Sequence, residues 1–203
     1  MSIDVIHHYT TIESLKAIVK NRGIRFKRLD RVDDMSEETS FVRLKLAPFF
    51  FVSSWTSSSE ESIPMWDRYG AEMSGVRLSL PKRMFDHRPI ELPPEISPLR
   101  QKSFSSPLPF EDIFGEQHLV LTMFLGPKDF ERQVEYDANF ARIKNDAIEI
   151  RHEADGKAAM TIHDPARIAS IKKPSWSYQV EFRFDDLSGP QDTKKSELFP
   201  DTV

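Results

Sequence analysis

The 203-residue sequence contains no cysteine, and this absence excludes several kinds of chemistry. Without cysteine there is no disulfide framework, thiolate nucleophile, zinc–thiolate site or iron–sulfur cluster. Glycine is also scarce, and no two of the seven glycines have the G-x-G spacing of a dinucleotide-binding turn. Gly70 and Gly75 have the spacing of a phosphate-binding loop, but Val76 stands where that loop requires lysine. The Rossmann and P-loop nucleotide sites are therefore excluded.

The sequence also lacks long apolar runs and a strong excess of one charge. No run approaches the roughly 20 apolar residues of a membrane span, and residues 1–8 have neither the basic start nor the length of a signal peptide. The 28 Lys and Arg residues and 32 Asp and Glu residues give a net charge of −4, which argues against a polycationic surface. We therefore expect a cytoplasmic protein that has no contact with a membrane.

Hydrophobic periodicity predicts alternating strands and helices in the first half of the chain. The first helix is expected to begin at the capping box of Thr10 and Glu13 and to end at Gly23. Pro64 suits the first turn of a second helix. The expected elements are a strand over 3–9, a helix over 12–22, a strand over 24–29, a buried strand over 49–52, a polar loop over 55–62, a helix from Pro64 and a strand over 75–81.

The second half predicts further elements of both kinds around an irregular, proline-rich insertion at 86–110. The expected elements are strands over 118–125, 130–136 and 180–184, a charged helix over 140–151 and a short helix that Asp164 caps. We expect one domain over 1–186 and a loose tail over 187–203. The predicted fold is α+β, with two packed, mostly antiparallel sheets and helices at their flanks.

Three segments place uncommon polar and aromatic residues at the ends of expected strands, where functional residues are often found. These segments are His7-His8-Tyr9-Thr10, the stretch from Phe51 through Met65-Trp66-Asp67-Arg68-Tyr69 to Gly75-Val76, and Trp176-Ser177-Tyr178-Gln179-Val180-Glu181-Phe182-Arg183. In this order they resemble a bacterial domain family of uncharacterised function, with the pattern H-Y-T, M-W-x-x-Y followed by G-V, and W-x-Y-x-x-E-x-R. The resemblance covers about residues 7–184.

The same segments resemble, more distantly, the signature of diphtheria-toxin-type and poly-ADP-ribose-polymerase-type ADP-ribosyltransferases. In those enzymes a first strand supplies His followed by Thr or Ser, a helix supplies Tyr, and a late strand supplies Glu. The matching residues are His8 with Thr10, Tyr69 and Glu181. The resemblance implies NAD as co-substrate in a cleft between two sheets. It also implies service as a toxin or phage-defence effector, with a neutralising antitoxin as a partner.

These residue types suit cleavage of the bond between nicotinamide and ribose. The reaction passes through an oxocarbenium-like state, which a carboxylate beside the sugar stabilises, and Glu181 is the candidate. Tyr69 is expected to stack on the nicotinamide ring, and His8 to bond a ribose hydroxyl. The other expected NAD-binding residues are Tyr9, Thr10, Phe51 and Ser53, with Trp55 as an alternative wall.

The third segment also predicts how an acceptor binds. Gln179 precedes Glu181 by two positions, and residues so spaced in a strand share a face. Gln-x-Glu resembles transferases whose acceptors are amides or guanine bases, so Gln179 is the second catalytic candidate. The expected acceptor-binding residues are Trp176 and Tyr178, which would stack a base, and Arg25 and Lys27, which would contact phosphates. RNA or DNA is therefore favoured over protein as the acceptor.

Glu181 also has an ordinary structural explanation, as the ion-pair partner of Arg183 or Lys173. Two other functions stay open as well. A non-catalytic nucleic-acid sensor would use the same aromatic and basic residues without needing Glu181. A metal-dependent hydrolase would draw on His7, His8, Asp33, Asp34, His163 and Asp164, although adjacent strand residues point to opposite faces. The transferase hypothesis alone requires the side chains of His8, Tyr69 and Glu181 to line one cleft.

Overall fold

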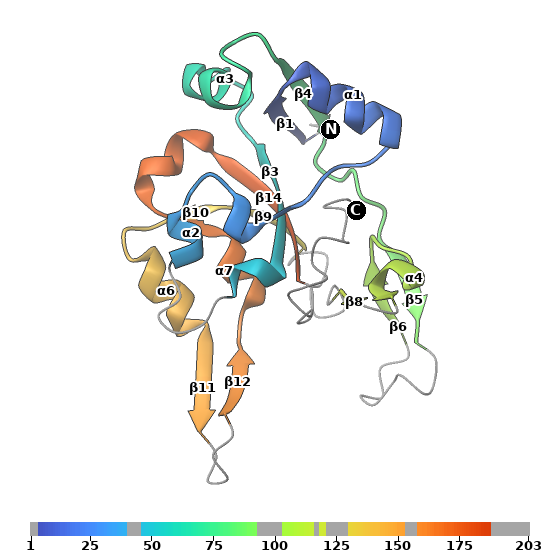
Figure 1. The fold of residues 1–203 in the computed structure, drawn as a ribbon, viewed down its shortest axis with the longest axis vertical. Coiled ribbons are helices and arrows are strands. Elements are labelled where there is room, and N and C mark those ends of the chain that lie inside the picture. Colours follow the sequence, from blue (N-terminus) through green and yellow to red (C-terminus); the bar gives the residue numbers. More distant parts are fainter. Residues whose placement is uncertain are drawn as a thin grey trace.

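An antiparallel six-stranded sheet is the centre of the structure (Figure 1). The fold is known from a computed structural model of the chain, which describes residues 4–39, 46–92, 103–115, 118–120, 130–152 and 158–187. The strand order is β4-β1-β3-β14-β9, and β2 pairs with the same edge of β3 as β1. The strands are β1 Val5–Thr10, β2 Lys27–Arg28, β3 Phe50–Thr56, β4 Val76–Pro81, β9 Glu131–Gln133 and β14 Glu181–Leu187.

The other described strands form four two-stranded sheets. Three of these are antiparallel, and β10 with β13 is parallel. The pairs are β5 Arg88–Glu91 with β6 Ser103–Ser106, β7 Phe114–Gly115 with β8 His118–Leu119, β10 Glu135–Tyr136 with β13 Ile171–Lys172, and β11 Ile148–His152 with β12 Ala158–Ile162. The α+β class and the mostly antiparallel pairing are confirmed. The prediction of two packed sheets is wrong, because the described strands form one large sheet and four small ones.

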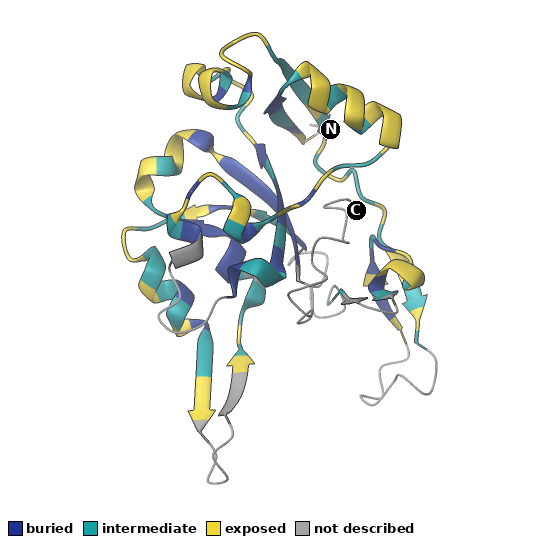
Figure 2. Cartoon of the chain, in the orientation of Figure 1, coloured by how far each residue is buried: buried dark blue, intermediate teal, exposed yellow. Residues whose placement is uncertain are grey.

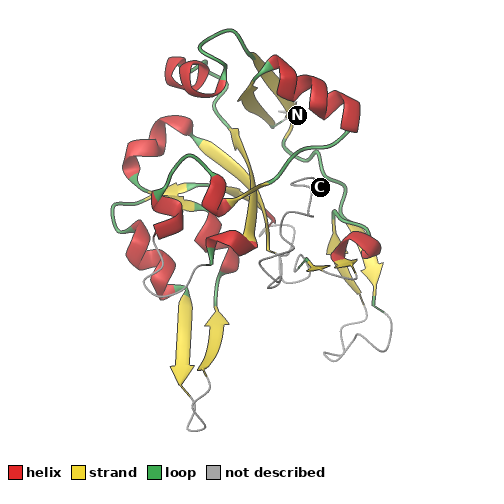
Figure 3. Cartoon of the chain, in the orientation of Figure 1, coloured by secondary structure: helices red, strands yellow, loops and turns green. Residues whose placement is uncertain are grey.

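Short helices surround the central sheet (Figure 3). The α-helices are α1 Ile12–Asn21, α2 Ser36–Thr39, α3 Ile63–Tyr69, α4 Phe110–Ile113, α6 Phe140–Asp146 and α7 Pro165–Ala169. The 3-10 helices are η1 Leu29–Arg31, η2 Ala47–Phe49 and η4 Pro174–Gln179. None of the helices in the described ranges has the length and apolar character needed to cross a membrane.

The register of the central sheet gives its two faces different side chains. Paired residues of an antiparallel ladder project to the same face. Thr56 pairs with His7 of β1 and with Glu181 of β14, so these three side chains share one face, which we call the ionic face. Trp55 pairs with Phe182, and these side chains project to the opposite, aromatic face.

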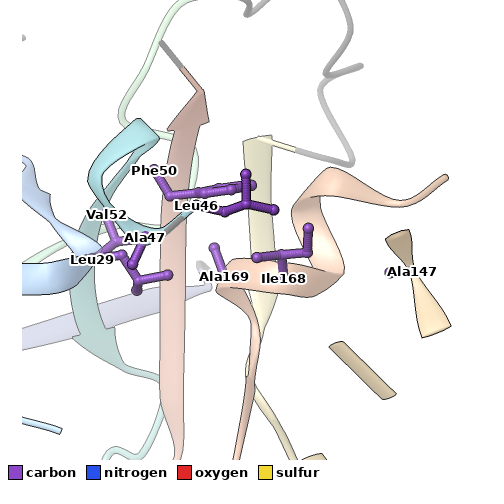
Figure 4. Close-up of a cluster of buried hydrophobic side chains, with 8 residues drawn as sticks. All are labelled: Leu29, Leu46, Ala47, Phe50, Val52, Ala147, Ile168 and Ala169. Carbon is purple, nitrogen blue, oxygen red and sulfur yellow. The ribbon is translucent and has the colours of Figure 1, made fainter. Parts of the chain in front are cut away.

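Each face carries its own hydrophobic core. On the ionic face, Phe50 and Val52 pack with a buried group from η1, η2 and α7 (Figure 4). On the aromatic face, Trp55, Phe182 and Phe184 pack with Ile6 and other buried aromatic residues. Burying each such side chain stabilises the fold by roughly 1.5–3 kcal/mol. The buried members of both cores are no more than 7% exposed, so side chains are covered on both faces of the sheet, and β14 is dark blue along most of its length in Figure 2.

Several predicted elements are confirmed. Strands β1, β3, β4 and β14 are present, and β3 is buried at all but two of its positions. Helix α3 has its proline in the first turn. The Asp164 side chain caps α7 by accepting a bond of 3.0 Å from the backbone N–H of Arg167. Cap residues and apolar alternation therefore located the elements that carry the three segments.

Other predicted elements are wrong. The insertion at 86–110 contains the hairpin strands β5 and β6. Residues 148–152 form strand β11 and not the end of a helix, because they pair with β12. Trp55 and Thr56 belong to β3 and not to a loop, and the strand predicted over 24–29 is limited to β2. Residues 121–125 and 188–203 lie outside the described residues.

The ends of α1 also differ from the prediction by one residue each. Thr11 and not Thr10 is the N-cap, since its hydroxyl accepts a bond of 3.1 Å from the backbone N–H of Ser14. Arg22 and not Gly23 ends the helix, in a left-handed conformation with φ 52°. This shift leaves Thr10 inside β1, paired with Val76.

Candidate active site

A tight turn after α3 brings the second segment against the end of β1. Gly75 is required there, since a Cβ atom on it would lie 2.3 Å from the carbonyl oxygen of Thr10. Ala71, Glu72 and Met73 reach this turn in left-handed conformations with φ of 47°, 51° and 70°. Such conformations cost non-glycine residues roughly 1–2 kcal/mol each, so the surrounding packing holds them in place.

Tyr9 fixes α3 to the ionic face of β1. Its ring meets Trp66 edge to face at a centroid distance of 4.8 Å, and its hydroxyl accepts a bond of 3.1 Å from the backbone N–H of Ser62. The guanidinium carbon of Arg77 lies over the Tyr9 ring, 5.5 Å from its centre. Tyr9 is only 3% exposed. It therefore acts here as a buried support for α3, and Thr10 likewise is buried beside the turn.

Five residues form a continuous line of polar contacts, which we call the polar chain: Asp33, Tyr69, Gln179, Lys172 and Glu181. The Tyr69 hydroxyl donates to Oδ2 of Asp33 at 2.5 Å and accepts from Nε2 of Gln179 at 2.7 Å. Nζ of Lys172 donates to Oε1 of Gln179 at 3.2 Å and lies 2.6 Å from Oε2 of Glu181. The polar chain thus joins Tyr69 of the second segment to Gln179 and Glu181 of the third.

The buried end of the polar chain is an ionic cluster of Glu37, Lys172, Glu181 and Arg183. Nε of Arg183 donates to Oε1 of Glu181 at 2.6 Å, and its two terminal nitrogens donate to the two oxygens of Glu37 at 2.6 and 2.7 Å. Lys172 lies 3.2 Å from Oε1 of Glu37. Two carboxylates face two cations, so the formal charges of these four groups balance.

The cations keep both carboxylates of the ionic cluster ionised. Burial favours their protonated forms, but the charges of Arg183 and Lys172 outweigh burial and lower the pKa of Glu181. The same balance lowers the pKa of Glu37 to about 2. Glu181 therefore carries its negative charge at neutral pH, as stabilisation of an oxocarbenium ion requires.

Glu181 is also covered by protein. Its exposed fraction is 3%, and each of its oxygens contacts a cation of the ionic cluster. Its backbone N–H donates to the hydroxyl of Tyr136 at 2.8 Å. The ordinary explanation of Glu181 as a partner of Arg183 is confirmed. The second partner is Lys172 and not Lys173, whose Nζ lies 3.7 Å from Asp34.

His8 does not share the surroundings of Glu181. Its ring lies 5.1 Å from that of Trp55, on the aromatic face, and its Nδ1 bonds the carbonyl oxygen of Ser54 at 2.8 Å. Burial lowers the pKa of His8, so the ring is neutral and Nδ1 is the donor. The expectation that His8, Tyr69 and Glu181 line one cleft is wrong, because alternation along β1 and β3 separates His8 from Glu181.

The remaining expected NAD-binding residues of β3 are on the aromatic face as well. Phe51 packs against the core of that face. The Ser53 hydroxyl is buried and accepts a bond of 2.9 Å from the indole N–H of Trp55. These two residues therefore belong to the packing around Trp55 and do not join the polar chain.

Gln179 and Glu181 meet for a different reason from the one predicted. Gln179 ends η4, and β14 begins only at Glu181. Val180 between them is left-handed, with φ 42° and ψ 49°. A β-branched residue is rarely found there. The reversal at Val180, and not strand alternation, brings both side chains to Lys172.

The expected acceptor-binding residues are divided between two places. Trp176 and Tyr178 of η4 are stacked, with ring centres 6.2 Å apart, and the guanidinium of Arg68 lies 4.7 Å from the centre of the Trp176 ring. Tyr178 is 37% exposed. Lys27 lies in β2, on the opposite side of β3 from β14, and Arg25 precedes it. Only the aromatic pair therefore adjoins the polar chain.

The structure adds four residues that sequence reasoning did not assign to the site: Asp33, Glu37, Arg68 and Lys172. Asp33 was considered only as a metal ligand, and Arg68 and Lys172 stand beside chosen residues without a signal of their own. Asp34, which was also considered as a metal ligand, accepts a bond of 3.0 Å from the backbone N–H of Ser36 at the start of α2. Within the described ranges, no three His, Asp or Glu residues gather to hold a metal ion.

No protein-family model, curated protein or solved structure matches the chain.

Proposed function

We propose that this chain is an NAD-dependent ADP-ribosyltransferase that modifies a macromolecule, with a nucleic-acid base as the favoured acceptor. The prediction of one cleft that includes His8 is wrong, so the proposal is restricted to Tyr69, Gln179 and Glu181, and the single observation that carries it is the polar chain. It joins Tyr69 to Gln179, 110 positions apart, and through Lys172 to Glu181. These are the residues to which the transferase resemblance assigns the nicotinamide, the acceptor and the sugar.

The chemistry divides between these three residues. The bond from C1′ of the ribose to the nicotinamide nitrogen breaks, and its electron pair leaves with neutral nicotinamide. An acceptor nitrogen or oxygen then bonds C1′ and loses its proton to solvent. The ionised Glu181 stabilises the sugar cation between these two events. Tyr69 is half-buried and offers its ring to the nicotinamide, and the Gln179 amide suits a base edge.

Access to Glu181 requires a rearrangement in this proposal. Gln179 and Lys172 lie between Tyr69 and Glu181 and are themselves no more than 3% exposed. The element to move is η4, because its residue Tyr178 and the adjoining Val180 are exposed and Trp176 is half-buried. Its displacement would release Gln179 from Tyr69 and Lys172 and uncover the side of the Glu181 carboxylate where Lys172 lies, while Arg183 keeps its bond on the other side.

The test compares two carboxylate substitutions in the ionic cluster. Glu181→Gln and Glu37→Gln each remove one negative charge beside Arg183 and Lys172, so both are expected to destabilise the fold. The proteins are incubated with labelled NAD and pooled RNA, DNA and protein, and transfer is measured per folded molecule. We expect Glu181→Gln to abolish transfer and nicotinamide release, and Glu37→Gln to retain both. Equal losses in the two variants would contradict the catalytic role of Glu181.

A non-catalytic nucleic-acid sensor is the second candidate, favoured by the surface above the polar chain. Arg68 stacks on Trp176, and Tyr178 extends this surface toward solvent. Such a surface binds single-stranded bases by stacking. The sensor predicts RNA or DNA binding that Trp176→Ala weakens, together with no turnover of NAD by the wild-type protein.

The biological setting of the proposed activity follows from the family resemblance alone. We propose a cytoplasmic toxin or phage-defence effector, held inactive by an antitoxin until it is needed. Expression of the chain alone in cells distinguishes this setting from a housekeeping role. Growth arrest on expression of the wild-type chain, absent with Glu181→Gln, is the expected result.

A further inference from the structure

Asp33 lies at the outer end of the polar chain, in the loop between η1 and α2. Its Oδ2 accepts two bonds, from the Tyr69 hydroxyl at 2.5 Å and from Nε of Arg68 at 2.7 Å. The side chains of Arg68 and Asp33 are 45% and 38% exposed, so this ion pair adds little to stability. The bond to Tyr69, in contrast, leads into the protein.

Asp33 and Lys172 together fix the directions of the hydrogen bonds that lie between them. A carboxylate can only accept, so the Tyr69 hydroxyl commits its one proton to Asp33. The Tyr69 oxygen then accepts from its inner neighbour, which is Nε2 of Gln179. The Gln179 amide therefore turns Oε1 toward Lys172, whose ammonium group can only donate and so requires the same orientation. Burial opposes ionisation of Asp33, but the bonds from Tyr69 and Arg68 lower its pKa and keep it charged.

We propose that Asp33 is the positioning residue of this site: its carboxylate holds the Tyr69 ring in place and, through the Tyr69 hydroxyl, keeps the Gln179 amide in the orientation that Lys172 also requires. The proposal rests on the proposed function, in which Tyr69 stacks on nicotinamide and Gln179 faces the acceptor. Asp33 acts only through these two residues and contacts neither NAD nor the acceptor. Loss of its carboxylate frees the Tyr69 ring, so the first consequence is weaker binding of NAD.

The chain offers a matched control three residues earlier. Asp30 accepts from Nε and Nη2 of Arg28 at 2.9 and 2.5 Å, which is an aspartate–arginine pair like that of Asp33 and Arg68. The side chains of Arg28 and Asp30 are 16% and 17% exposed, so this pair is more buried than the pair of Arg68 and Asp33. This pair connects β2 to η1 and is not part of the polar chain. Asp30→Ala therefore removes an aspartate–arginine pair with more hydrogen bonds and more burial, without touching Tyr69, which makes it a stringent control for loss of an ion pair.

The kinetic experiment separates positioning from stability. In Asp33→Ala we expect the KM for NAD to rise about tenfold, the effect of losing a hydrogen bond to a charged group. We expect kcat per folded molecule to change by less than about twofold, because the reacting carboxylate is untouched. Asp33→Asn keeps an oxygen acceptor and restores most of the affinity, and Asp30→Ala leaves both constants unchanged. In a Tyr69→Phe background, Asp33→Ala adds no further loss.

A second readout does not depend on activity. The side-chain NH2 signals of Gln179, identified by their disappearance in Gln179→Glu, report the bond from Nε2 to Tyr69. We expect Asp33→Ala to shift these signals and Asp30→Ala to leave them in place. Unchanged Gln179 signals, or kinetic effects of Asp33→Ala and Tyr69→Phe that simply add, would overturn the proposal. If the wild-type chain does not turn over NAD, the transferase function fails, and the NMR signals still decide whether Asp33 orients Gln179.

Discussion

The two faces of the central sheet are stabilised by different forces. On the aromatic face, Trp55, Phe182 and Phe184 pack among other apolar side chains. The ionic face has an apolar core around Phe50 and Val52 of β3. It also carries two buried charged residues, Glu181 and Arg183, which lie two positions apart in β14. Apolar packing tolerates changes in pH and salt, whereas buried charges depend on each partner being present and ionised. Substitutions on the two faces should therefore behave differently.

The largest effect is expected from removal of the central cation of the ionic face. Arg183→Met leaves Glu37 and Glu181 buried with Lys172 as their remaining partner in the ionic cluster. Breaking a buried pair from one side costs about 3–5 kcal/mol. We expect urea unfolding to show a loss of this size in the free energy of unfolding. A loss below about 1 kcal/mol would contradict the electrostatic account of this face.

The next effect is a loss of stability in acid. Burial opposes ionisation of Glu37, but Arg183 and Lys172 lower its pKa to about 2, against 4.5 for the free side chain. A carboxylate with a lowered pKa stabilises the fold above its unfolded pKa, and this stability is lost as pH falls from 4.5 toward 2. The difference corresponds to about 3 kcal/mol.

Urea unfolding at a series of pH values from 7 to 2.5 measures this loss. Glu181 contributes in the same direction because its pKa is also lowered, and Lys144 and Asp34 are further charged groups beside the ionic cluster. In Glu37→Gln the fall between pH 4.5 and 2.5 should be shallower than in the wild type. An equally steep fall would assign acid sensitivity to other carboxylates.

The aromatic face provides the contrasting substitution. Phe184 is fully buried against Phe85, Phe130 and Phe182, so Phe184→Leu leaves a small cavity and should cost about 1–2 kcal/mol. The difference from the wild type should stay constant from pH 7 to 4 and in 1 M salt. A cost that changes with pH would show that the two faces are coupled.

The same contrast explains what the sequence could predict. Apolar alternation in β3 and β14 and the cap of α7 are local signals, so these elements and the α+β class followed from them, and α1 was predicted with each end misplaced by one residue. Tyr69, Gln179 and Glu181 were chosen by resemblance, and the structure connects them. The faces of the strands depend on register, which is why His8, Phe51 and Ser53 were assigned to the wrong side.

The partners of Glu181 could not have been predicted in full. Arg183 follows two positions later in the same strand and was foreseen, but Glu37 lies 146 positions away from it in a short helix. A glutamate in such a helix is usually exposed, and its burial depends on the loop at Asp33 and Asp34. Long-range ion pairs of this kind leave no periodic pattern in a sequence.

The smallest effect is a gain, expected at the residue that links the two functional side chains. Val180 is left-handed between Gln179 and Glu181, and its side chain is 40% exposed, so little packing is lost on its removal. A left-handed non-glycine residue costs roughly 1–2 kcal/mol, and glycine forfeits about 0.5–1 kcal/mol of this through its freedom in the unfolded chain. Val180→Gly should therefore raise the free energy of unfolding by about 0.5–1 kcal/mol. Val180→Ala, which keeps a Cβ atom, should gain much less. If Val180→Gly also lowers NAD turnover, the strained backbone is what holds Gln179 against Tyr69, and stability at this position has been exchanged for the geometry of the polar chain.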